Sequence, residues 1–515
     1  MTTGHVFVVQ GRIENLDCDA IVIPTDDVFR VEPHWAPALG APASATGETW
    51  YRTLRDAAPE AWHSSRWGRL TPGALPWEPP RPVWFVDAAS YSARRLAAER
   101  DLRALASRLA AIVDDVAAAG LPASHGRPHP LIAVPTLGVG GGGFGPLRGM
   151  VIDEVLTTAL AVVATNPVDV VFVALLEADY AAFQDRRRSL VGHPKLPGEA
   201  ADALGSLIGK ASAGTLAVFI GAGVSMSVGL PSWEELLDQL AGDDESHHDL
   251  SSPLDRAQLL RHRLGTGLGD RVAEIVGKQQ RYGLTHALLA GLGASHAVTT
   301  NYDHLYELAL ADRLSGGRPL HVLPYDKDEP HRPWLVKMHG DVEHPGEVVL
   351  ARSDFVGYTS RSGPLGAVVQ SLLMTEHLLV VGASLSDDNF LRLAHEVLAF
   401  RRGHHRLGTV LKFTVTAAER ELWAEAFDFV AVASPSDEPG AAARRLAIVL
   451  DTLAMRAARP VYVLDERYDD LLSAAERPVA TAARSLGAAI ASLPEADGDR
   501  WSNIATALRD HGLPG

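Results

Sequence analysis

The chain has 515 residues, more than a single hydrophobic core usually organises, so its length predicts two or three domains. Hydrophobic residues make up 47% of it and charged residues 21%, a composition that argues against bulk disorder. The formal net charge of −16, from 47 Lys and Arg against 63 Asp and Glu, disfavours nucleic acid as a partner.

The single cysteine, Cys18, excludes an internal disulfide and a cysteine-rich zinc site, and we expect no metal. The first residues lack the charged and apolar regions of a signal peptide, and no apolar run reaches the length that spans a bilayer. These features predict a cytoplasmic protein with no membrane partner.

The first segment predicts an α/β domain over residues 1–190. Helical periodicity with few breakers is present over 95–119 and 151–163. Between and around these helices, short apolar runs are typical of buried strands. The runs are residues 6–9, 20–23, 83–86, 131–134 and 170–176.

A domain boundary is predicted at 184–199, where three arginines, 186–188, lead into a Gly- and Pro-rich stretch. The arginines could bind an anion, but we interpret them as a solvated charge run at a helix end. A second α/β domain is then expected over 200–435.

From about residue 440 to 515 the pattern predicts a helical C-terminal extension, with helices over 441–457 and 480–493. It shows no catalytic constellation and is interpreted as packing or oligomer surface. Apolar helices favour a homo-oligomer, although an apolar helix face can equally pack within one subunit.

Four short motifs in the second domain each follow an apolar run. They are GAGVS at 221–225, TTNYD at 299–303, KMHGD at 337–341 and GAS at 382–384. Ligands of open parallel sheets bind outside the carboxyl ends of the strands, so the four motifs predict one shared nucleotide pocket. Met226 replaces the third glycine of a dinucleotide fingerprint, and a hydride-transferring enzyme is therefore not expected.

Gly221, Ala222 and Gly223 form the first of these strand ends, where glycine lets the backbone approach a bound group. Ser232 and Glu235 then have the spacing of a capping box at a helix start. Free backbone N–H groups in such a loop and helix start suit a pyrophosphate.

Asn301 and Asp303 flank Tyr302 at the second strand end, where short polar side chains can hold ribose hydroxyls or a carboxamide. Asp303 can also be an Asx cap of the predicted helix 305–314. Asn301, two residues earlier, is harder to explain as a cap.

His339 lies at the third strand end and precedes Gly340. A histidine can take a proton from a hydroxyl at neutral pH once it is positioned. In a chain with 21 histidines, a single histidine is most simply interpreted as a hydrogen-bonded core residue. His339, however, follows an apolar run as the other three motifs do, and this position favours a functional role.

The four motifs, the last of them extended to 382–387 (GASLSD), occur in the order and approximate spacing of the sirtuin (SIR2) superfamily. They most resemble its bacterial defence branch, typified by the NAD-hydrolysing effector of Thoeris antiphage systems. The resemblance covers about residues 205–435. It implies a Rossmann-like parallel sheet and NAD as the substrate.

Two departures separate the chain from deacetylase sirtuins. Those enzymes carry a four-cysteine zinc module, which a chain with only Cys18 cannot contain. They also follow the glycine loop with Asp-Phe-Arg, where this chain has 232–234 (SWE). Protein deacetylation is therefore disfavoured, whereas cleavage of NAD is not.

By resemblance, Asn301 would orient the nicotinamide ribose or the attacking water, and His339 would act as base on a ribose hydroxyl. Asp303 would help to hold the nicotinamide end, and Gly382 with Ser384 would approach the adenosine side. The glycine loop, with Gly221, Ala222, Gly223 and Ser225, would also contact NAD. Asp387 and Asn389 are interpreted as possible caps of the next helix.

The first domain resembles a macro domain at residues 6–23 and in the glycine-rich loop 135–146, which can form an anion nest. Arg12 stands where many macro domains have an adenine-contacting aspartate, and 24–27 (PTDD) replaces the Asn-rich loop. The resemblance implies an ADP-ribose-like or cyclic ADP-ribose signal as ligand. Arg12 can equally be a surface side chain, and the glycines a flexible loop.

The sequence thus predicts an NAD+ hydrolase that releases nicotinamide and ADP-ribose, acting as an antiphage effector under control of the macro-like domain. Two alternatives stay open. One is an NAD-dependent protein ADP-ribosyltransferase linked to a macro eraser domain. The other is a sensor that binds NAD or ADP-ribose without turnover.

Overall fold

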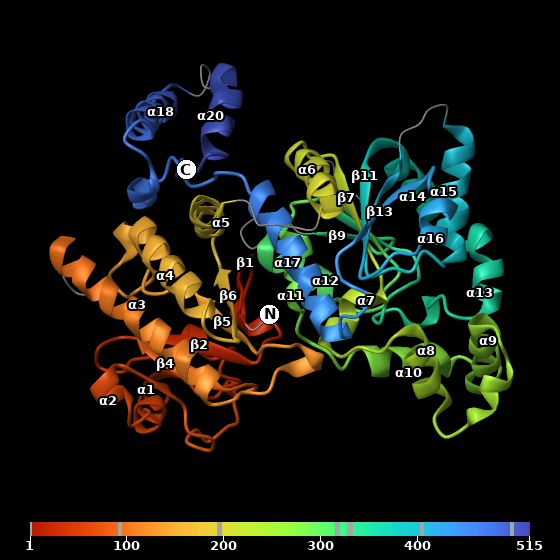
Figure 1. Cartoon of the computed structure of the whole chain (residues 1–515), viewed down its shortest axis with the longest axis horizontal. Helices are drawn as coiled ribbons and strands as arrows, with labels where there is room; N and C mark the ends of the chain where they lie inside the picture. The colour runs from red at the N-terminus through yellow and green to blue at the C-terminus, as the bar shows by residue number, and fades with distance from the viewer. Residues whose placement is uncertain are drawn as a thin grey trace. The chain divides into compact units, whose positions relative to one another are not determined.

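Two sheets of mainly parallel strands organise the chain, one in each of two units (Figure 1). The computed structural model describes residues 3–90, 95–192, 198–314, 320–326, 333–401, 406–494 and 499–514. Unit 1 consists of Met1–Pro194 with Ala458–Gly515, and unit 2 of Lys195–Ala457. The predicted α/β class with a helical C-terminal region is confirmed.

Unit 1 contains a six-stranded sheet in the order β1-β6-β5-β2-β4-β3. Its neighbours pair in parallel except at the edge, where β3 is antiparallel to β4. The strands are β1 (Val6–Gln10), β2 (Ala20–Thr25), β3 (Trp67–Arg69), β4 (Val83–Asp87), β5 (Leu131–Pro135) and β6 (Asp169–Ala174).

Helices from both ends of the chain complete unit 1. They are α1 (Gly47–Asp56), α2 (Trp62–Ser65), α3 (Arg95–Ala118), α4 (Arg148–Val163), α5 (Glu177–Val191), α18 (Glu476–Ala491) and α20 (Ser502–Arg509). Buried phenols join the C-terminal segment to α5. The hydroxyl of Tyr468 donates to Asp179 Oδ1 at 2.7 Å, and that of Tyr462 to Asp185 Oδ2 at 2.5 Å.

The arginine run is built into unit 1 rather than solvated, which corrects the sequence interpretation. Helix α5 continues through it to Val191. The Arg187 side chain is buried and donates to the Val6 carbonyl at 2.7 Å and to Gln184 Oε1 at 2.8 Å. A guanidinium can be buried when its donors are satisfied in this way. The rest of the expected boundary, 193–197, lies outside the described residues.

Unit 2 contains a seven-stranded sheet in the order β13-β12-β11-β7-β8-β10-β9, with neighbouring strands parallel in the described residues. Apolar runs with both faces covered are typical of such sheets. The strands are β7 (Leu216–Ile220), β8 (His296–Thr299), β9 (His321–Leu323), β10 (Trp334–Lys337), β11 (His377–Val381), β12 (Gly408–Lys412) and β13 (Phe427–Ala431).

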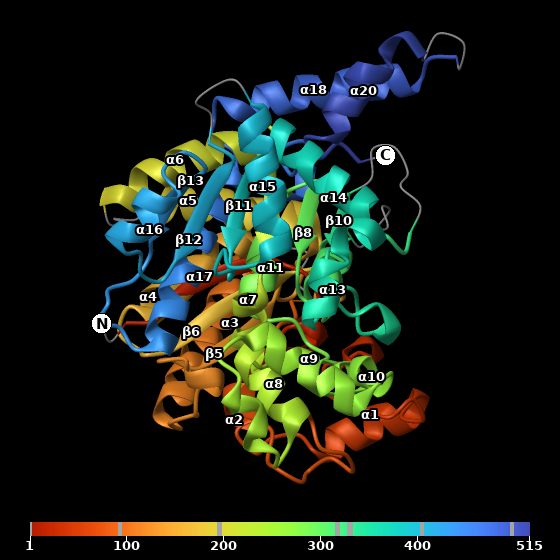
Figure 2. The ribbon, with the colours of Figure 1, turned by 90° about the vertical axis from the view of Figure 1, so that its right-hand side faces the viewer.

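Helices cover both faces of this sheet. Figures 1 and 2 show α14 and α15 on one face and α11, α12 and α17 on the other. The helices are α6 (Gly198–Ser212), α7 (Ala222–Ser225), α8 (Trp233–Ala241), α9 (Pro253–Leu264), α10 (Gly267–Val276), α11 (Leu284–Gly291), α12 (Leu305–Arg313), α13 (Arg352–Val356), α14 (Tyr358–Thr375), α15 (Asp388–Phe400), α16 (Ala417–Leu422) and α17 (Pro439–Ala457).

The strand order reverses at β7, which places a topological switch point at the centre of the sheet. From β7 the chain proceeds to β8 on one side and later returns to β11 on the other. Ligands of doubly wound sheets bind at such a point, outside the carboxyl ends of the strands. None of the helices that the structure describes is long and apolar enough to cross a bilayer.

Candidate functional site

A cavity of about 250 Å³ opens at the switch point, and all four motifs contribute to it. Every predicted site residue except Gly223 lines this cavity. The expected residues that line the cavity are Gly221, Ala222, Ser225, Asn301, Asp303, His339, Gly382 and Ser384. The strand order and the parallel direction of the strands therefore bring together residues, such as Gly221 and Ser384, that lie more than 160 positions apart in the sequence.

The glycines of the first and fourth motifs pack against each other. A Cβ on Gly221 would lie 2.5 Å from the Gly382 carbonyl oxygen, and Gly382 has a φ of +71°. The Gly223 N–H donates to that same carbonyl at 2.9 Å. These glycines allow the turns after β7 and β11 to touch, which is a different reason for glycine from the expected close approach of a ligand.

Ser225 is the centre of a buried hydrogen-bond network under the cavity. Its hydroxyl donates to Asp303 Oδ2 at 2.8 Å and accepts from Asn301 Nδ2 at 3.0 Å. It also accepts from His286 Nε2 at 3.2 Å. A serine hydroxyl has one donor and two acceptor sites, so Ser225 is fully used within the protein. It therefore positions its neighbours and has no hydrogen-bonding site left for a ligand.

Asn301 has one amide end fixed and the other end free of protein partners. Its Nδ2 donates to Ser225 and to the Gly221 carbonyl at 3.3 Å. Its Oδ1 is buried and accepts no hydrogen bond from any described residue. An unpartnered buried acceptor on a cavity wall costs stability unless a ligand or water satisfies it. Asn301 thus presents an oriented acceptor to whatever the cavity binds.

His286, on α11, fixes the direction of this network. The Gly283 N–H donates to its Nδ1 at 3.2 Å, which leaves the proton on Nε2 facing Ser225. Burial lowers the pKa of His286 to about 4, against the opposing effect of Asp303. The ring is therefore neutral at pH 7, and its Nε2–H serves as a fixed donor.

His339 faces a carboxylate across the cavity. Its Nε2 lies 3.0 Å from Asp387 Oδ2, while Asp387 Oδ1 accepts the Phe390 N–H at 2.8 Å and so caps α15. Burial raises the pKa of Asp387, but the facing imidazole and the backbone donors of α15 lower it by more. Asp387 is thus an ionised partner for His339 as well as the helix cap that the sequence suggests.

A buried ion cluster beneath the cavity ties the second motif to the third. Lys337 Nζ donates to the Asp303 carbonyl at 2.6 Å and pairs with Glu307 at 2.7 Å and Asp341 at 2.6 Å. Burial lowers the pKa of Lys337, but the two carboxylates raise it by more. Asp303 Oδ1 also accepts the Leu305 N–H at 3.0 Å, so Asp303 forms an Asx turn just before α12 and is a cavity residue as well.

Apolar side chains form the remaining wall. Trp233 and Leu236 come from α8, and Phe355 from α13 packs edge-on against the His339 ring with centroids 5.3 Å apart. The opposite rim carries the exposed Ser384, whose hydroxyl bonds to Ser386 at 2.6 Å. The apolar wall suits a flat ring, and the polar rim suits groups that are rich in hydroxyls.

Unit 1 has a second cavity of about 740 Å³. The glycine-rich loop supplies Gly138, Gly140, Gly141 and Gly142 to its lining, and Arg12 faces the same cavity. Within this cavity the Arg12 guanidinium lies 3.5 Å from Glu14 Oε1. Pro24, Thr25 and Asp26, from the segment that the sequence analysis places at the position of an Asn-rich loop, line this cavity as well.

Sequence reasoning missed the supporting residues of the unit 2 site. His286 lies in an apolar helix with no motif around it, and its role follows only from its 0% exposure and its contact with Ser225. Lys337 was also missed, although a lysine at the end of an otherwise apolar strand is a signal for a buried carboxylate partner. The pairing of Asp387 with His339 depends on tertiary structure.

Comparison with known proteins finds sequence similarity in unit 2. Residues 295–429 match the family model described as SIR2-like domain. The NAD(+) hydrolase ThsA of Bacillus cereus (strain MSX-D12) is 34% identical over 185 residues, which cover 34% of this chain and 38% of that protein. The NAD(+) hydrolase ThsA of Enterococcus faecium is 29% identical over 203 residues, covering 38% and 42%.

A further relative is Defense-associated sirtuin 2 of Bacillus subtilis, 26% identical over 34% of this chain and 18% of that protein. The chain thus spans about two fifths of the length of the first two relatives it matches. Among solved structures, an Oceanobacillus iheyensis macrodomain with ADP covers 36% of this chain and 90% of its own, at 15% identity and TM-score 0.28. A Sir2 enzyme structure covers 49% and 98%, at 13% identity and TM-score 0.29.

Proposed function

We propose that this chain, whose unit 2 carries a SIR2-like domain over residues 295–429, hydrolyses NAD+ to nicotinamide and ADP-ribose. The observation that carries the proposal is the buried, unpartnered Oδ1 of Asn301 in the same cavity as the His339 and Asp387 pair. The named activity of the ThsA relatives supports it. The catalytic domain is proposed to extend over about residues 200–435.

The reaction breaks the bond between the nicotinamide nitrogen and the ribose carbon. Nicotinamide leaves with the bonding electron pair, and an oxocarbenium-like ribose develops. Water adds its oxygen to that carbon and loses one proton, so NAD+ and water give nicotinamide, ADP-ribose and a proton. Fixed acceptors near the developing positive charge lower this barrier.

Asn301 Oδ1 would accept a hydrogen bond from the attacking water or from a ribose hydroxyl, because Ser225 holds the other end of its amide. His339 would take the proton from a hydroxyl, and the ionised Asp387 would hold the ring in place and stabilise the imidazolium that results. Asp303 would border the nicotinamide end. Gly382 and Ser384 would border the adenosine side, together with Gly221 and Ala222.

We also propose that unit 1 regulates this activity by binding an ADP-ribose-like or cyclic ADP-ribose signal. Arg12 and the glycine-rich loop line one cavity of about 740 Å³, which supports the assignment because an arginine and a nest of backbone N–H groups both suit phosphate. Loss of NAD would then arrest an infected bacterial cell, in keeping with the defence role in the name of one relative. The protein is proposed to act in the cytoplasm as a homo-oligomer.

The test is nicotinamide release from NAD+ by the purified full chain, with and without cyclic ADP-ribose. Wild type should release nicotinamide and ADP-ribose in equal amounts. Arg12→Ala should lose activation by the signal and keep the activity seen without it. Incorporation of labelled ADP-ribose into protein, without free ADP-ribose, would instead indicate a transferase.

A further inference from the structure

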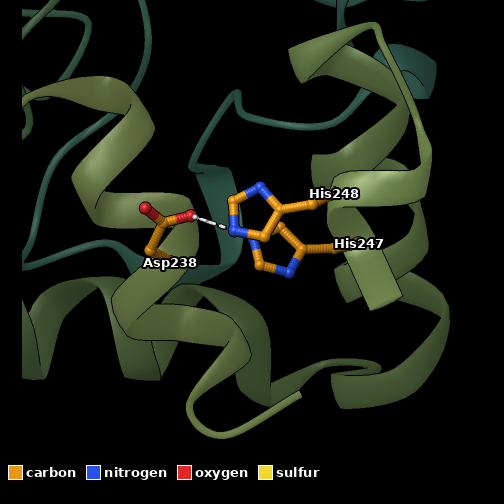
Figure 3. Close-up of side chains that lie close together, drawn as sticks. All are labelled: Asp238, His247 and His248. Atoms are coloured by element: carbon orange, nitrogen blue, oxygen red, sulfur yellow. Dashed lines mark hydrogen bonds and ion pairs between the residues drawn. The ribbon is translucent and has the colours of Figure 1, made fainter. Parts of the chain in front are cut away.

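Three side chains of types that can bind a metal gather in unit 2, outside the lining of the switch-point cavity (Figure 3). Asp238 lies on α8, and His247 and His248 lie on the short helix η6 (Glu245–Asp249). Asp238 Oδ1 is 2.9 Å from His247 Nε2 and 3.4 Å from His248 Nε2. The two imidazole rings lie side by side, with centroids 4.0 Å apart.

Both ring nitrogens of His247 face a hydrogen-bond acceptor. Its Nδ1 faces the Asp244 carbonyl at 2.9 Å, and a carbonyl oxygen can only accept, so Nδ1 carries a proton. Its Nε2 faces an ionised carboxylate, which also only accepts. A neutral imidazole cannot donate from both nitrogens. Either a second proton or a metal cation must therefore lie between Nε2 and Asp238.

The surroundings favour a metal ion over a second proton. His248 directs its own Nε2 at the same Asp238 oxygen, so two imidazole nitrogens converge on one carboxylate oxygen, as the ligands of a single metal ion do. Among the described residues, Asp238 forms no ion pair with a lysine or arginine. The His247 side chain is only 2% exposed, whereas Asp238 and His248 are each 49% exposed. A metal would thus have one buried ligand and an open side facing solvent.

A second cluster in the same unit provides a contrast. The ligand atoms of His304, Glu307 and Asp341 are also within 4.8 Å of one another. Lys337 Nζ fills that space, 2.7 Å from Glu307 and 2.6 Å from Asp341. Its ammonium already supplies the positive charge there. Among the described residues no lysine or arginine pairs with Asp238 in this way, and Arg263, the guanidinium at η6, pairs with Asp244 instead.

We propose that Asp238, His247 and His248 bind a divalent transition metal of the Zn2+ class. The ligands would be Asp238 Oδ1 and the Nε2 atoms of His247 and His248, with water in the fourth position. Tetrahedral zinc at 2.0–2.2 Å from its ligands requires ligand atoms roughly 3.3 Å apart, and the observed 2.9 and 3.4 Å bracket that value. The His247 Nδ1–H to carbonyl bond is the outer contact typical of metal-bound histidine.

The metal would act as a structural link rather than a catalyst. It would join η6 to α8, and the same α8 places Trp233 and Leu236 on the wall of the switch-point cavity. Leu236, Leu237 and Leu240 bury the opposite side of α8, so the helix is held on one face by the core and on the other by the metal.

The decisive experiment is Zn2+ titration of full-length protein without a polyhistidine tag, after removal of metals, against a chromophoric competing chelator. Wild type should bind one equivalent. His248→Ala and His247→Ala should each weaken binding by about 100-fold, at least the loss found when outer contacts of zinc ligands are removed. The matched control is His262→Ala, which removes an exposed histidine from α9 in the same unit and should bind as wild type does.

His248→Ala decides the matter if His247→Ala fails to fold, because the His248 side chain is half exposed. The metal-free melting temperature of His248→Ala should equal that of wild type, and added Zn2+ should raise the melting temperature of wild type alone. Equal Zn2+ affinity in His248→Ala and His262→Ala would overturn the proposal. So would wild-type binding no tighter than that of the His247→Ala/His248→Ala double variant. Neither readout depends on NAD turnover.

Discussion

The Nε2 atom of His339 lies 3.0 Å from Oδ2 of Asp387, and the other carboxylate oxygen of Asp387 caps helix α15. One side chain therefore fixes both the proposed base and the start of a core helix. Because α15 packs through Phe390 and Leu393 into the core of unit 2, the position of Asp387 is set by that core. The core therefore fixes the position of the carboxylate that faces His339.

Asp387→Asn should separate these two roles. Asparagine caps helices as well as aspartate does, so stability should stay close to wild type. The negative charge facing His339 is lost, and nicotinamide release should fall by about 10- to 100-fold, less than the roughly 10²- to 10⁴-fold expected from losing general base catalysis in His339→Ala.

Asp387→Ala is the matched comparison. It should lose about 1 kcal/mol of stability from the missing cap in addition to the loss of activity. Activity measurements at saturating NAD+ and urea denaturation of both variants check this. A fully active Asp387→Asn would show that Asp387 serves only as a cap.

Ser225→Ala should destabilise unit 2, although the change removes a single oxygen atom. It leaves Asp303 Oδ2, Asn301 Nδ2 and His286 Nε2 without their shared partner in a buried site. We expect a loss of about 1–3 kcal/mol in urea denaturation. Ser384→Ala removes an exposed hydroxyl that bonds only to Ser386 in the described residues, and its stability should be that of wild type.

Acid should destabilise unit 2 through His286. Burial lowers the pKa of His286 to about 4 from 6.5, so the unfolded chain binds this proton more readily than the folded one. The stability that the neutral His286 ring contributes is fully present above pH 6.5. It falls as the pH drops from 6.5 towards 4, and the loss is about 2 kcal/mol at pH 5. His377, whose pKa burial also lowers to about 4, adds to the effect.

The measurement is urea denaturation at pH 7 and pH 5. His286→Gln removes the titrating group, so its stability should change less between the two pH values than that of wild type. An equal change in both proteins would exclude His286 as a source of the acid sensitivity.

Lys337→Met should be strongly destabilising. It leaves Asp341 and Glu307 buried without their cation, at a cost of about 3–5 kcal/mol. Adding Glu307→Gln and Asp341→Asn removes the unpaired charges and should restore part of that loss. Urea denaturation of the single and triple variants tests this, and a triple variant less stable than Lys337→Met would contradict it.

Much of the site could be predicted because parallel sheets direct polar strand ends to one edge. The polar ends of β7, β8, β10 and β11 were visible in the sequence, and the strand order places them around one cavity. The capping box at Ser232 and Glu235 was also readable, since it depends only on local spacing, and it is confirmed.

The remaining features depend on contacts between distant segments. Arg187 reads as a surface charge until β1 provides its carbonyl partner 181 positions away. The glycines of the first motif read as a ligand loop, but Gly221 is required by the approach of Gly382. His286 reads as one more helix residue until Ser225 and Asp303 are placed beside it.

The most direct test of the account is nicotinamide release from NAD+ by full-length wild type, Asn301→Ala and His339→Ala, with and without cyclic ADP-ribose. His262→Ala, an exposed change on α9 outside the cavity lining, is the control for general damage to unit 2. The account predicts turnover by wild type and His262→Ala and its loss in the Asn301 and His339 variants, with folding intact. Turnover retained in both of these variants, or NAD+ binding by wild type without any turnover, would contradict it.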